Sequence, residues 1–372
     1  MIFLIITHVP HSFQKNQFFG YAPYIREMNV WLKYLSKVII IAPLENRNPS
    51  QIEIAYNHQN IIFIAVPSFN INSVNSLLKS FFTIPKIIFT LFKQMFSADH
   101  IHLRCPGNMG LLGCIVQIFF PNKVKTAKYA GNWDLKSKQP YTYKLQQYIL
   151  NNTFLTRNIQ VLVYGEWENI SKNIKPFFTA TYLESEINKI VPKRFDKTTK
   201  FVFVGTLVTG KNALYAIKIV QNLAKVNHQV KLDLYGEGDQ RIVLENYVKT
   251  NNLHEFIFIH GNKDQETIKK AYQESHFTIL PSASEGWPKA IAEGMFWACV
   301  PVATSVSCVP DMLNYGERGL LLTLDLENDC KKLTPLLNFS SDYQIMSQKA
   351  ANWSRKYTLD FFEQEIKLLL QV

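Results

Sequence analysis

The most informative stretch of this chain is Ser284-Glu285-Gly286-Trp287-Pro288-Lys289-Ala290-Ile291-Ala292-Glu293. An apolar strand pattern precedes it at 277–280, and a second one follows at 300–304. The residues between these runs have the spacing of a turn that opens a helix. A strand, a helix and a second apolar strand in this order predict part of a parallel α/β sheet.

The chemistry of this stretch suits a ligand with a charged centre and polar ends. A helix N-terminus offers N–H groups and partial positive charge, which favour a phosphate. Glu285 stands before the turn and Glu293 inside the helix, so their carboxylates cannot bind the phosphate but can accept hydrogen bonds from hydroxyls beside it. A diphosphate with a polyol at each end describes a nucleotide-sugar, and this is the interpretation we develop.

Length and composition favour an ordered protein of two domains. The chain has 372 residues, of which 47% are hydrophobic, so each half can bury its own core. The apolar start at 1–6 lacks a basic leader and a small-residue cleavage site, and we interpret it as a first strand. No run reaches the roughly 18 uncharged apolar residues of a membrane span. The five cysteines include no C-x-x-C pair, which favours reduced thiols and a cytoplasmic setting.

The positive charge of the chain is concentrated in its first half. Residues 1–175 contain 18 Lys and Arg against 7 Asp and Glu, whereas residues 176–372 contain 22 of each. The whole excess of +11 therefore lies before residue 176. This segregation favours an anionic partner or surface facing that half, and a solvated basic face is the alternative.

Short apolar runs alternate with helical patterns along the whole chain. Strand patterns lie at 2–7, 37–42, 61–66, 100–103, 123–129 and 160–163, and again at 201–205, 230–234, 256–259, 277–280 and 300–304. Helical patterns include 24–35, 107–118, 213–225, 241–250, 266–274, 289–297 and 359–370. The polar segment 184–200 separates the two series. This alternation predicts an α/β fold with two doubly wound parallel sheets, whose ligands bind beyond the carboxyl ends of the strands.

The stretch 77–97 is unusual because polar residues follow a single narrow stripe. Apart from Pro85, which would kink or break a helix, nearly every other residue is Leu, Ile, Phe or Met. Either this helix is buried on most sides, or it presents apolar surface and lysines to a membrane. The stripe consists of Lys79, Thr83, Lys86, Thr90, Lys93 and Ser97.

Three further turns follow strand patterns in the second half. The turn Gly205-Thr206-Leu207-Val208-Thr209-Gly210-Lys211 joins a strand to a helix, and it places a cation where it can neutralise a phosphate. It is not a Walker A loop, because the glycine spacing differs and Asn212 replaces the Ser or Thr. Gly236 and Gly261 end two other strands. Each could pack closely against a ligand, or each could simply form an ordinary turn.

Taken together, these motifs resemble the retaining glycosyltransferases of family 4, which have the GT-B fold. The resemblance covers most of residues 200–310. Weaker features at His100-Ile101-His102-Leu103-Arg104 and Gly131-Asn132-Trp133-Asp134 extend it into the first half. It implies two Rossmann-like domains across a cleft: 1–180 for the acceptor and 195–358 for the nucleotide-sugar. A terminal helix at 359–372 would return to the first domain.

The resemblance assigns roles to the donor residues. Glu293 would hold the ribose hydroxyls and Glu285 the donor-sugar hydroxyls, while Lys211 stabilises the diphosphate; Glu285 and Lys211 are the catalytic candidates. Two residues depart from the family pattern, since Thr206 replaces a usual arginine and Pro288, which lacks an N–H, replaces a common glycine. The donor-binding set is Gly205, Thr206, Lys211, Gly236, Gly261, Glu285, Gly286, Trp287, Lys289, Ala290 and Glu293.

The first half would then bind the acceptor. We expect Gly20 to shape a loop near the reacting centre, and the other candidates to lie at strand ends. For His102 the alternative is a histidine satisfied at the end of a strand. Gly131-Asn132 stands where relatives often carry a histidine, so we assign no catalytic histidine. The acceptor-binding candidates are Gly20, His102, Arg104, Asn132 and Asp134.

The implied function is transfer of a sugar to a saccharide or lipid-linked saccharide in bacterial cell-surface polysaccharide synthesis, such as capsule or lipopolysaccharide. It needs no cofactor and no metal, and the location is cytoplasmic. Lysines could meet anionic lipid at the inner membrane face, namely Lys123, Lys125, Lys128, Lys136 and Lys138. A catalytically inert GT-B binding module and a nucleotide-sugar epimerase stay open as alternatives. Charge alone suggests a nucleic-acid partner, and no recognition motif accompanies it.

Overall fold

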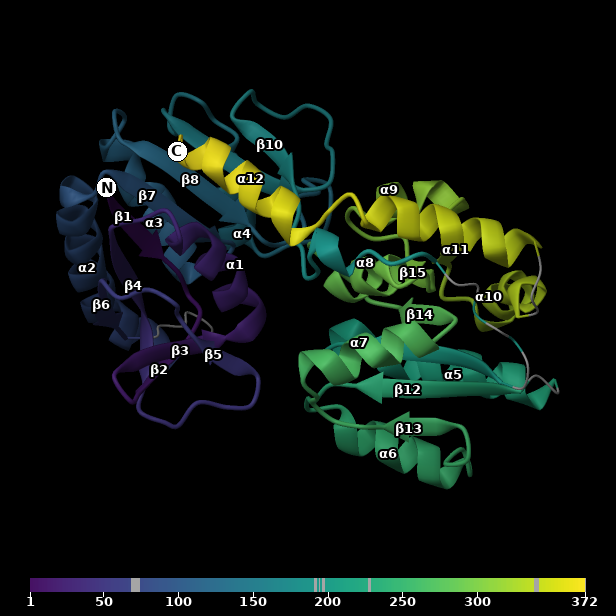
Figure 1. The fold of residues 1–372 in the computed structure, drawn as a ribbon. Coiled ribbons are helices and arrows are strands. Elements are labelled where there is room, and N and C mark those ends of the chain that lie inside the picture. Colours follow the sequence, from purple (N-terminus) through teal and green to yellow (C-terminus); the bar gives the residue numbers. More distant parts are fainter. Residues whose placement is uncertain are drawn as a thin grey trace. The chain divides into compact units, whose positions relative to one another are not determined.

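The computed structural model describes residues 1–67, 74–190, 193, 195, 198–226, 229–337 and 341–371, with the backbone alone for 74–82. The chain divides into two compact units (Figure 1). Unit 1 comprises Met1–Phe178 and Glu363–Val372, and unit 2 comprises Thr179–Phe362. The sheet of unit 2 is parallel throughout, and that of unit 1 is parallel except for the pairings of the strand Gln17–Tyr21 with its two neighbours.

The sheet of unit 1 has a parallel centre in which strands pair in the order β6-β4-β1-β7-β8-β9-β10. The strand order reverses direction between β1 and β7, so this is the topological switch point of unit 1. The parallel strands are β1 (Ile2–Ile6), β4 (Lys37–Glu45), β6 (Ile61–Val66), β7 (His100–Cys105), β8 (Val124–Tyr129), β9 (Ile159–Tyr164) and β10 (Ile174–Phe177).

Three further strands extend this sheet beyond β4. β2 (His11–Gln14) and β3 (Gln17–Tyr21) form a hairpin, and β5 (Glu53–Ala55) pairs with β3. The hairpin turns at Lys15 and Asn16, which have φ of 48° and 61°, as a tight two-residue turn requires. Gly20 therefore lies in a strand opposite His11, and our expectation of a loop there was wrong.

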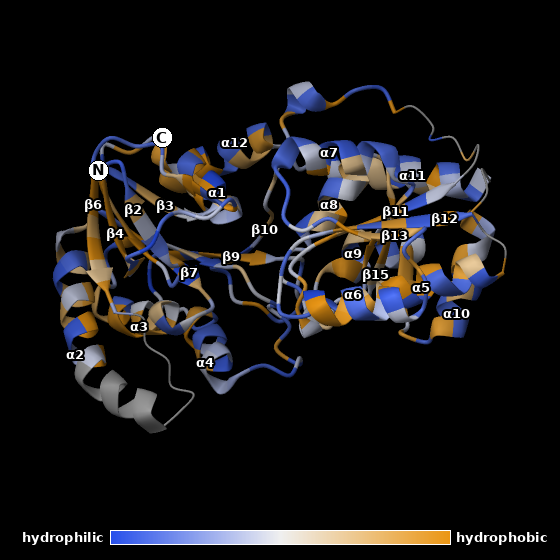
Figure 2. Cartoon of the chain, turned by 90° about the horizontal axis from the view of Figure 1, so that it is seen from below, coloured by the Kyte–Doolittle hydropathy of each residue, from blue (hydrophilic) through white to orange (hydrophobic). Residues whose placement is uncertain are grey.

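Helices cover both faces of the unit 1 sheet, with α1 and α12 on one face and α2, α3 and α4 on the other (Figure 2). The part of α12 that begins at Glu363 is tied to unit 1 by ion pairs of Glu363 with Lys33 at 2.8 Å and of Glu365 with Lys175 at 2.6 Å. α2 continues through Pro85 without ending. The helices are α1 (Ala22–Leu32), α2 (Val74–Ser97), α3 (Asn108–Val116), α4 (Tyr141–Leu150) and α12 (Leu359–Leu370).

Unit 2 contains a six-stranded sheet in the order β13-β12-β11-β14-β15-β16, with every pair parallel. This is the doubly wound order of a dinucleotide-binding fold, and its switch point lies between β11 and β14. The strands are β11 (Thr199–Val204), β12 (Val230–Tyr235), β13 (Ile257–Ile259), β14 (Phe277–Leu280), β15 (Val300–Thr304) and β16 (Leu320–Leu322).

Helices also cover both faces of the unit 2 sheet. Figure 2 shows α7, α8 and α11 on one face and α5, α6 and α10 on the other. The core of the first face is aromatic, because Tyr272 of α7 and Phe296 and Trp297 at the end of α8 pack on Val202 of β11. The helices are α5 (Ala213–Lys225), α6 (Arg241–Thr250), α7 (Gln265–Glu274), α8 (Lys289–Phe296), α9 (Val309–Met312), α10 (Leu326–Leu333) and α11 (Ser341–Ser354).

Candidate active site

The switch point of unit 2 brings two distant loops together. One loop follows β11 and contains Lys211, and the other follows β14 and contains Glu285. The backbone N–H of Ala283 donates to the carbonyl of Gly210 at 2.8 Å, which ties the loops to each other. Since ligands of doubly wound sheets bind where the strand order reverses, this is the expected place for a site.

An ion pair joins the two loops at their side chains. Lys211 Nζ lies 2.5 Å from Glu285 Oε1, and the two side chains are 26% and 7% exposed. Asn212, in the left-handed conformation with φ of 52°, follows Lys211 and precedes α5 without a capping hydrogen bond from its side chain. A cation and a largely buried carboxylate, our two catalytic candidates, therefore meet at the switch point.

The loops after three neighbouring strands interlock through their backbones. The N–H of Gly205 donates to Tyr235 O at 3.0 Å, and that of Gly236 donates to Gly261 O at 2.9 Å. Gly236 has a φ of 141°, and a Cβ placed on it would lie only 1.8 Å from the carbonyl oxygen of Gly205. Gly236 thus lets its loop approach that of Gly205, and Thr206 lies exposed next to Gly205.

The start of α8 lies directly beyond the loop that carries Glu285. The N–H groups of Ile291 and Ala292 donate to the carbonyl of Pro288 at 3.0 and 3.2 Å. The helical N–H groups ahead of them belong to Lys289 and Ala290, which are the two amides that we expect to face a phosphate.

The turn before α8 is held by the segment after β15. The carbonyl of Gly286 accepts hydrogen bonds from Ser307 Oγ at 3.2 Å and from Cys308 Sγ at 3.1 Å. Burial raises the pKa of Cys308 to about 12, so its thiol keeps the proton that it donates. The indole of Trp287 packs against Trp353, with ring centroids 6.0 Å apart. The position of the turn is therefore set by packing and hydrogen bonds.

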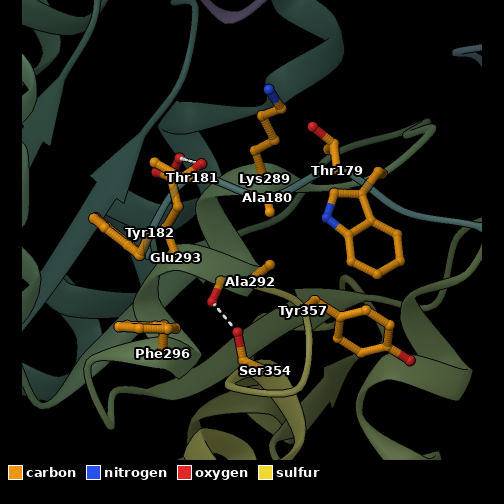
Figure 3. Close-up of a pocket in the computed structure, with 11 residues that line it drawn as sticks. Thr179, Ala180, Thr181, Tyr182, Lys289, Ala292, Glu293, Phe296, Ser354 and Tyr357 are labelled. Atoms are coloured by element: carbon orange, nitrogen blue, oxygen red, sulfur yellow. Dashed lines mark hydrogen bonds between the residues drawn. The ribbon is translucent and has the colours of Figure 1, made fainter. Parts of the chain in front are cut away.

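Glu293 lines a small pocket of unit 2 together with the segment that begins at Thr179 (Figure 3). Its Oε1 accepts a hydrogen bond from Thr181 Oγ1 at 2.7 Å. Lys289 lines the same pocket, and its ammonium end is directed away from Glu293 in Figure 3. Burial first, and then the negative charge of Glu293, raises the pKa of Tyr182 and of Tyr272, so both phenols stay neutral around this carboxylate.

The two glutamates of the motif thus engage different groups. Glu285 is paired with Lys211 at the switch point, and Glu293 is bonded to Thr181 in the pocket at α8. Gly205, Gly236 and Gly261 contribute backbone to the same edge of the sheet. Every donor-binding candidate therefore lies either in a loop at this carboxyl edge or in the first turns of α8.

The acceptor candidates of β7 are largely enclosed within unit 1. His102 is 1% exposed, and its Nδ1 shares a hydrogen bond of 2.8 Å with Thr126 Oγ1. His102 is therefore a buried strand histidine that is satisfied at Nδ1 only, because its Nε2 is buried without a hydrogen-bond partner. Arg104 Nη1 donates to Glu27 Oε1 at 3.2 Å, and the guanidinium lies 5.3 Å from the ring centroid of Tyr24. Arg104 is thus an interior ion-pair partner whose side chain is 12% exposed.

The loop after β8 holds the two other polar acceptor candidates. Asn132 Oδ1 accepts from the N–H of Asp134 at 2.9 Å, and Asp134 Oδ1 accepts from the N–H of Lys136 at 2.9 Å. Both side chains therefore shape their own loop, and both are half-buried. Gly20 is enclosed, because a Cβ placed on it would lie 3.1 Å from Ile25 Cδ1 and 3.2 Å from His11 Cδ2.

One residue at the switch point of unit 1 was missed. The switch point of unit 1 lies between β1 and β7. His8 lies just after β1, and Gly107 lies just after β7. A Cβ placed on Gly107, which has a φ of 150°, would lie 2.6 Å from His8 Nδ1. The signal was available, because a histidine two residues beyond the first strand of a doubly wound sheet lies at its ligand-binding edge.

Two of the five lysines proposed to meet lipid are buried. Lys125 Nζ donates to Phe120 O at 2.7 Å, and burial lowers the pKa of Lys125 to about 8. Lys128 Nζ donates to Phe178 O at 2.9 Å and lies 4.3 Å from the ring centroid of Phe177. With exposures of 2% and 1%, neither ammonium can reach a membrane, and that part of the prediction was wrong.

Comparison with known proteins now gives the class of the second half. Residues 184–353 match the family of glycosyl transferases group 1. The chain therefore carries a group 1 glycosyltransferase domain, which lies within unit 2.

Individual relatives are distant. An uncharacterized glycosyltransferase of Methanocaldococcus jannaschii is 27% identical over 158 residues, which are 42% of this chain and 43% of that protein. The Campylobacter jejuni enzyme named GalNAc-α-(1→4)-GalNAc-α-(1→3)-diNAcBac-PP-undecaprenol α-1,4-N-acetyl-D-galactosaminyltransferase is 24% identical over 210 residues, 55% of this chain and 57% of that one. The chain thus spans less than two thirds of either relative.

A solved structure matches over the whole chain. HepE of Anabaena, crystallised with UDP and glucose, superimposes with a TM-score of 0.70 at 12% identity, covering 100% of this chain and 99% of that one. At this identity the likeness shows the fold alone. Together with the two largely parallel sheets it confirms the predicted α/β fold of the GT-B class. Among the described residues, no helix combines the length and the hydropathy that crossing a membrane requires.

Proposed function

We propose that this protein is a retaining, metal-independent glycosyltransferase of the family 4 type. It would move a sugar from a nucleotide-sugar to a saccharide or lipid-linked saccharide in cell-surface polysaccharide synthesis. The observation that carries the proposal is the Lys211–Glu285 pair of 2.5 Å at the switch point of a group 1 glycosyltransferase domain. A cation and a carboxylate close to the start of α8 support the proposal, because a nucleotide-sugar offers a diphosphate to the one and hydroxyls to the other.

Lys211 is proposed to exchange one anionic partner for another. In the structure its ammonium is paired with the carboxylate of Glu285. A donor diphosphate carries more charge than one carboxylate, so it can draw the ammonium towards itself. Glu285 is then released to accept hydrogen bonds from the hydroxyls of the donor sugar.

Glu293 is proposed to hold the ribose of the donor. Its carboxylate already accepts a hydroxyl hydrogen bond, from Thr181 at 2.7 Å, and ribose hydroxyls offer the same kind of donor. Gly286, Trp287, Lys289 and Ala290 would surround the diphosphate between the two glutamates. The amides at the start of α8 supply fixed positive ends of dipoles there.

The proposed reaction breaks the bond between the anomeric carbon and the diphosphate oxygen, and the electron pair stays on the diphosphate. The acceptor hydroxyl oxygen bonds to the anomeric carbon on the same face, and its proton passes to the departing phosphate. Lys211 and the α8 amides stabilise the charge that grows on the leaving group. No further nucleophile is required by this scheme.

The acceptor and the location are proposed on coarser grounds. The name of the Campylobacter jejuni relative gives that enzyme an undecaprenyl diphosphate-linked acceptor. A lipid-linked acceptor of this kind would place the present protein in the cytoplasm, at the inner membrane face. The excess of positive charge before residue 176 fits an anionic surface there.

The test is a thermal-shift panel with UDP-, GDP-, ADP- and CDP-sugars, followed by a transfer assay with the donor that binds. One donor class should raise the melting temperature, transfer should survive EDTA, and NMR of the product should show the anomeric configuration of the donor. Glu293→Ala should abolish the shift, whereas Glu266→Ala, at an exposed position of α7, should leave it unchanged.

Each alternative has its own outcome. Binding without turnover towards any acceptor would favour an inert module, and interconversion of free nucleotide-sugars would favour an epimerase. A product of inverted configuration, or loss of transfer in EDTA, would overturn the corresponding part of the mechanism. No response to any donor class would overturn the whole proposal.

A further inference from the structure

The outer face of α2 exposes phenylalanines to solvent. Phe89, Phe92 and Phe96 are 72%, 45% and 73% exposed. They recur at steps of three and four, so they form one stripe along the helix. The opposite face of α2 is buried in the core of unit 1, where Ile87, Leu91 and Met95 are at most 1% exposed. Figure 2 shows hydrophobic positions recurring along the described part of α2.

A neighbouring segment enlarges this stripe. Phe119, in the 3-10 turn Gln117–Phe119 after α3, is 68% exposed and lies 6.2 Å from Phe92 between ring centroids. Phe92 is anchored from below by Phe120 at 4.9 Å. The Phe patch, defined as Phe89, Phe92, Phe96 and Phe119, is therefore a joint surface of two elements. Contiguous aromatic exposure of this kind indicates an interaction surface.

Cations border the Phe patch. Lys86 lies three residues before Phe89 and Lys93 four residues after it, so both occupy the helix surface next to the stripe. Both lysines are exposed, and the sequence of α2 contains no aspartate or glutamate. An aromatic stripe with lysines along its side is the pattern of a helix that lies in a membrane interface.

We propose that the Phe patch, with Lys86 and Lys93, docks unit 1 onto a bilayer that contains anionic phospholipid. The rings would enter the interface between headgroups and acyl chains, and the ammonium groups would meet lipid phosphates. The charge of the surface argues for this occupant over a second copy of the chain. A symmetric dimer through the same face would set its lysines against those of its partner.

This proposal rests on the proposed function only in that a lipid-linked acceptor gives the docking a purpose. Vesicle binding can be measured without donor or acceptor, so the two proposals fail separately. If the protein docks but transfers no sugar, the function is wrong and the surface stands. If it transfers sugar to a water-soluble acceptor but never docks, the surface is wrong and the function stands.

The experiment is co-sedimentation of the full chain with vesicles of phosphatidylcholine alone, and of phosphatidylcholine with about 30% phosphatidylglycerol. We expect binding to the anionic vesicles to exceed binding to the neutral ones by at least about tenfold, and to fall as salt is raised. Phe89→Ser/Phe96→Ser/Phe119→Ser, at the three most exposed rings, should lower vesicle affinity by about tenfold or more. Lys86→Glu/Lys93→Glu should lower it by a similar factor on anionic vesicles only.

Matched controls lie in unit 2. Ile242→Ser/Val243→Ser removes exposed apolar side chains from α6, which are 70% and 50% exposed, and should leave vesicle binding unchanged. Lys249→Glu/Lys263→Glu, at exposed positions, should weaken it less than twofold. A thermal melt and turnover of a water-soluble acceptor establish that each variant is folded.

Two results would overturn the proposal. One is equal binding of wild type and the triple Phe variant to anionic vesicles. The other is a wild-type dimer, seen by light scattering, that becomes a monomer in the triple variant while vesicle binding is unchanged. The second result would assign the Phe patch to self-association.

Discussion

The two units share a strand order but differ in where they place their charges. In unit 2 the paired charges of Lys211 and Glu285 lie in loops at the carboxyl edge of the sheet. In unit 1, Lys125 and Lys128 lie inside the sheet itself and bond to carbonyl oxygens. The comparison teaches that strand order locates the ligand-binding edge, whereas the depth of each side chain along its strand decides whether it can reach a ligand.

The largest effect should come from the edge of unit 2. Lys211→Ala is expected to lower kcat/KM about 100- to 1000-fold, because it removes a fixed positive charge from the departing diphosphate. Lys200→Ala, which breaks only an exposed pair with Glu274, should change kcat/KM less than about twofold. Steady-state kinetics with the donor found in the panel measures both, and an unchanged kcat/KM in Lys211→Ala would remove the distinction between the units.

A large effect on stability is expected at the interlocked loops of unit 2. Gly236→Ala would put a methyl group where the carbonyl oxygen of Gly205 stands 1.8 Å away, and we expect a loss of about 3 kcal/mol in the free energy of unfolding. Gly210→Ala is the control, since no heavy atom lies within 4 Å of a Cβ there. Urea unfolding, followed by fluorescence, compares the two variants. Equal urea midpoints would count against close backbone packing between the loops of Gly205 and Gly236.

Acid should unfold unit 1 before unit 2. Burial lowers the pKa of His11 and of His100 to about 4, below the unfolded value of 6.5. Between these values the unfolded chain binds more protons, so stability present above pH 6.5 is lost as the pH falls towards 4. Each histidine is expected to cost on the order of 2 kcal/mol between pH 7 and pH 4.5.

Hydrogen exchange resolved by peptide measures this acid sensitivity in each unit. Protection should fall first in the strands that carry these histidines, β2 and β7, and His100→Gln should reduce the pH dependence. Unit 2 has three described histidines, of which His254 and His260 are at least partly exposed and His276 is buried. Greater acid loss in unit 2 than in unit 1 would contradict the expectation.

The smallest effect should come from the exposed lysines of unit 1. Lys136→Ala/Lys138→Ala is expected to shift the free energy of unfolding by no more than about 0.5 kcal/mol. Lys128→Ala should cost several times more, because it leaves the carbonyl of Phe178 without this donor and removes a cation from between two aromatic rings. Thermal melts of the two variants give the ratio of their losses in stability. Similar losses would mean that the burial of a lysine does not decide its contribution to stability.

Much of the fold was predictable from the spacing of hydrophobic residues along the sequence. The patterns at 213–225, 241–250, 277–280 and 300–304 coincide with α5, α6, β14 and β15. The hairpin of β2 and β3 was missed, because Lys15-Asn16 replaces the glycine-containing turn that marks such hairpins. The three-residue strands β5 and β16 were missed as well, since segments so short gain their stability from pairing rather than from their own residues.

The candidate site was predictable in its members but not in its contacts. Glu285 and Lys211 each follow a strand, and the sequence places both at the carboxyl edge. Their pairing could not be foreseen, because it joins loops 74 positions apart. The acceptor side was less predictable. His102 and Lys125 occupy strand patterns, and a strand pattern does not say how deep in a parallel sheet a polar residue lies.

The contact between Gly236 and Gly205 bears on how the protein meets its ligand. Loops locked backbone to backbone have already lost most of their conformational entropy during folding. A donor that lands on them would not have to order them again, and more of its contact energy would remain as affinity. The same crowding leaves little space for a larger residue at Gly236. Differences in donor preference among similar proteins should therefore arise from exposed side chains beside these two glycines, such as Thr206, and not from the glycine loops themselves.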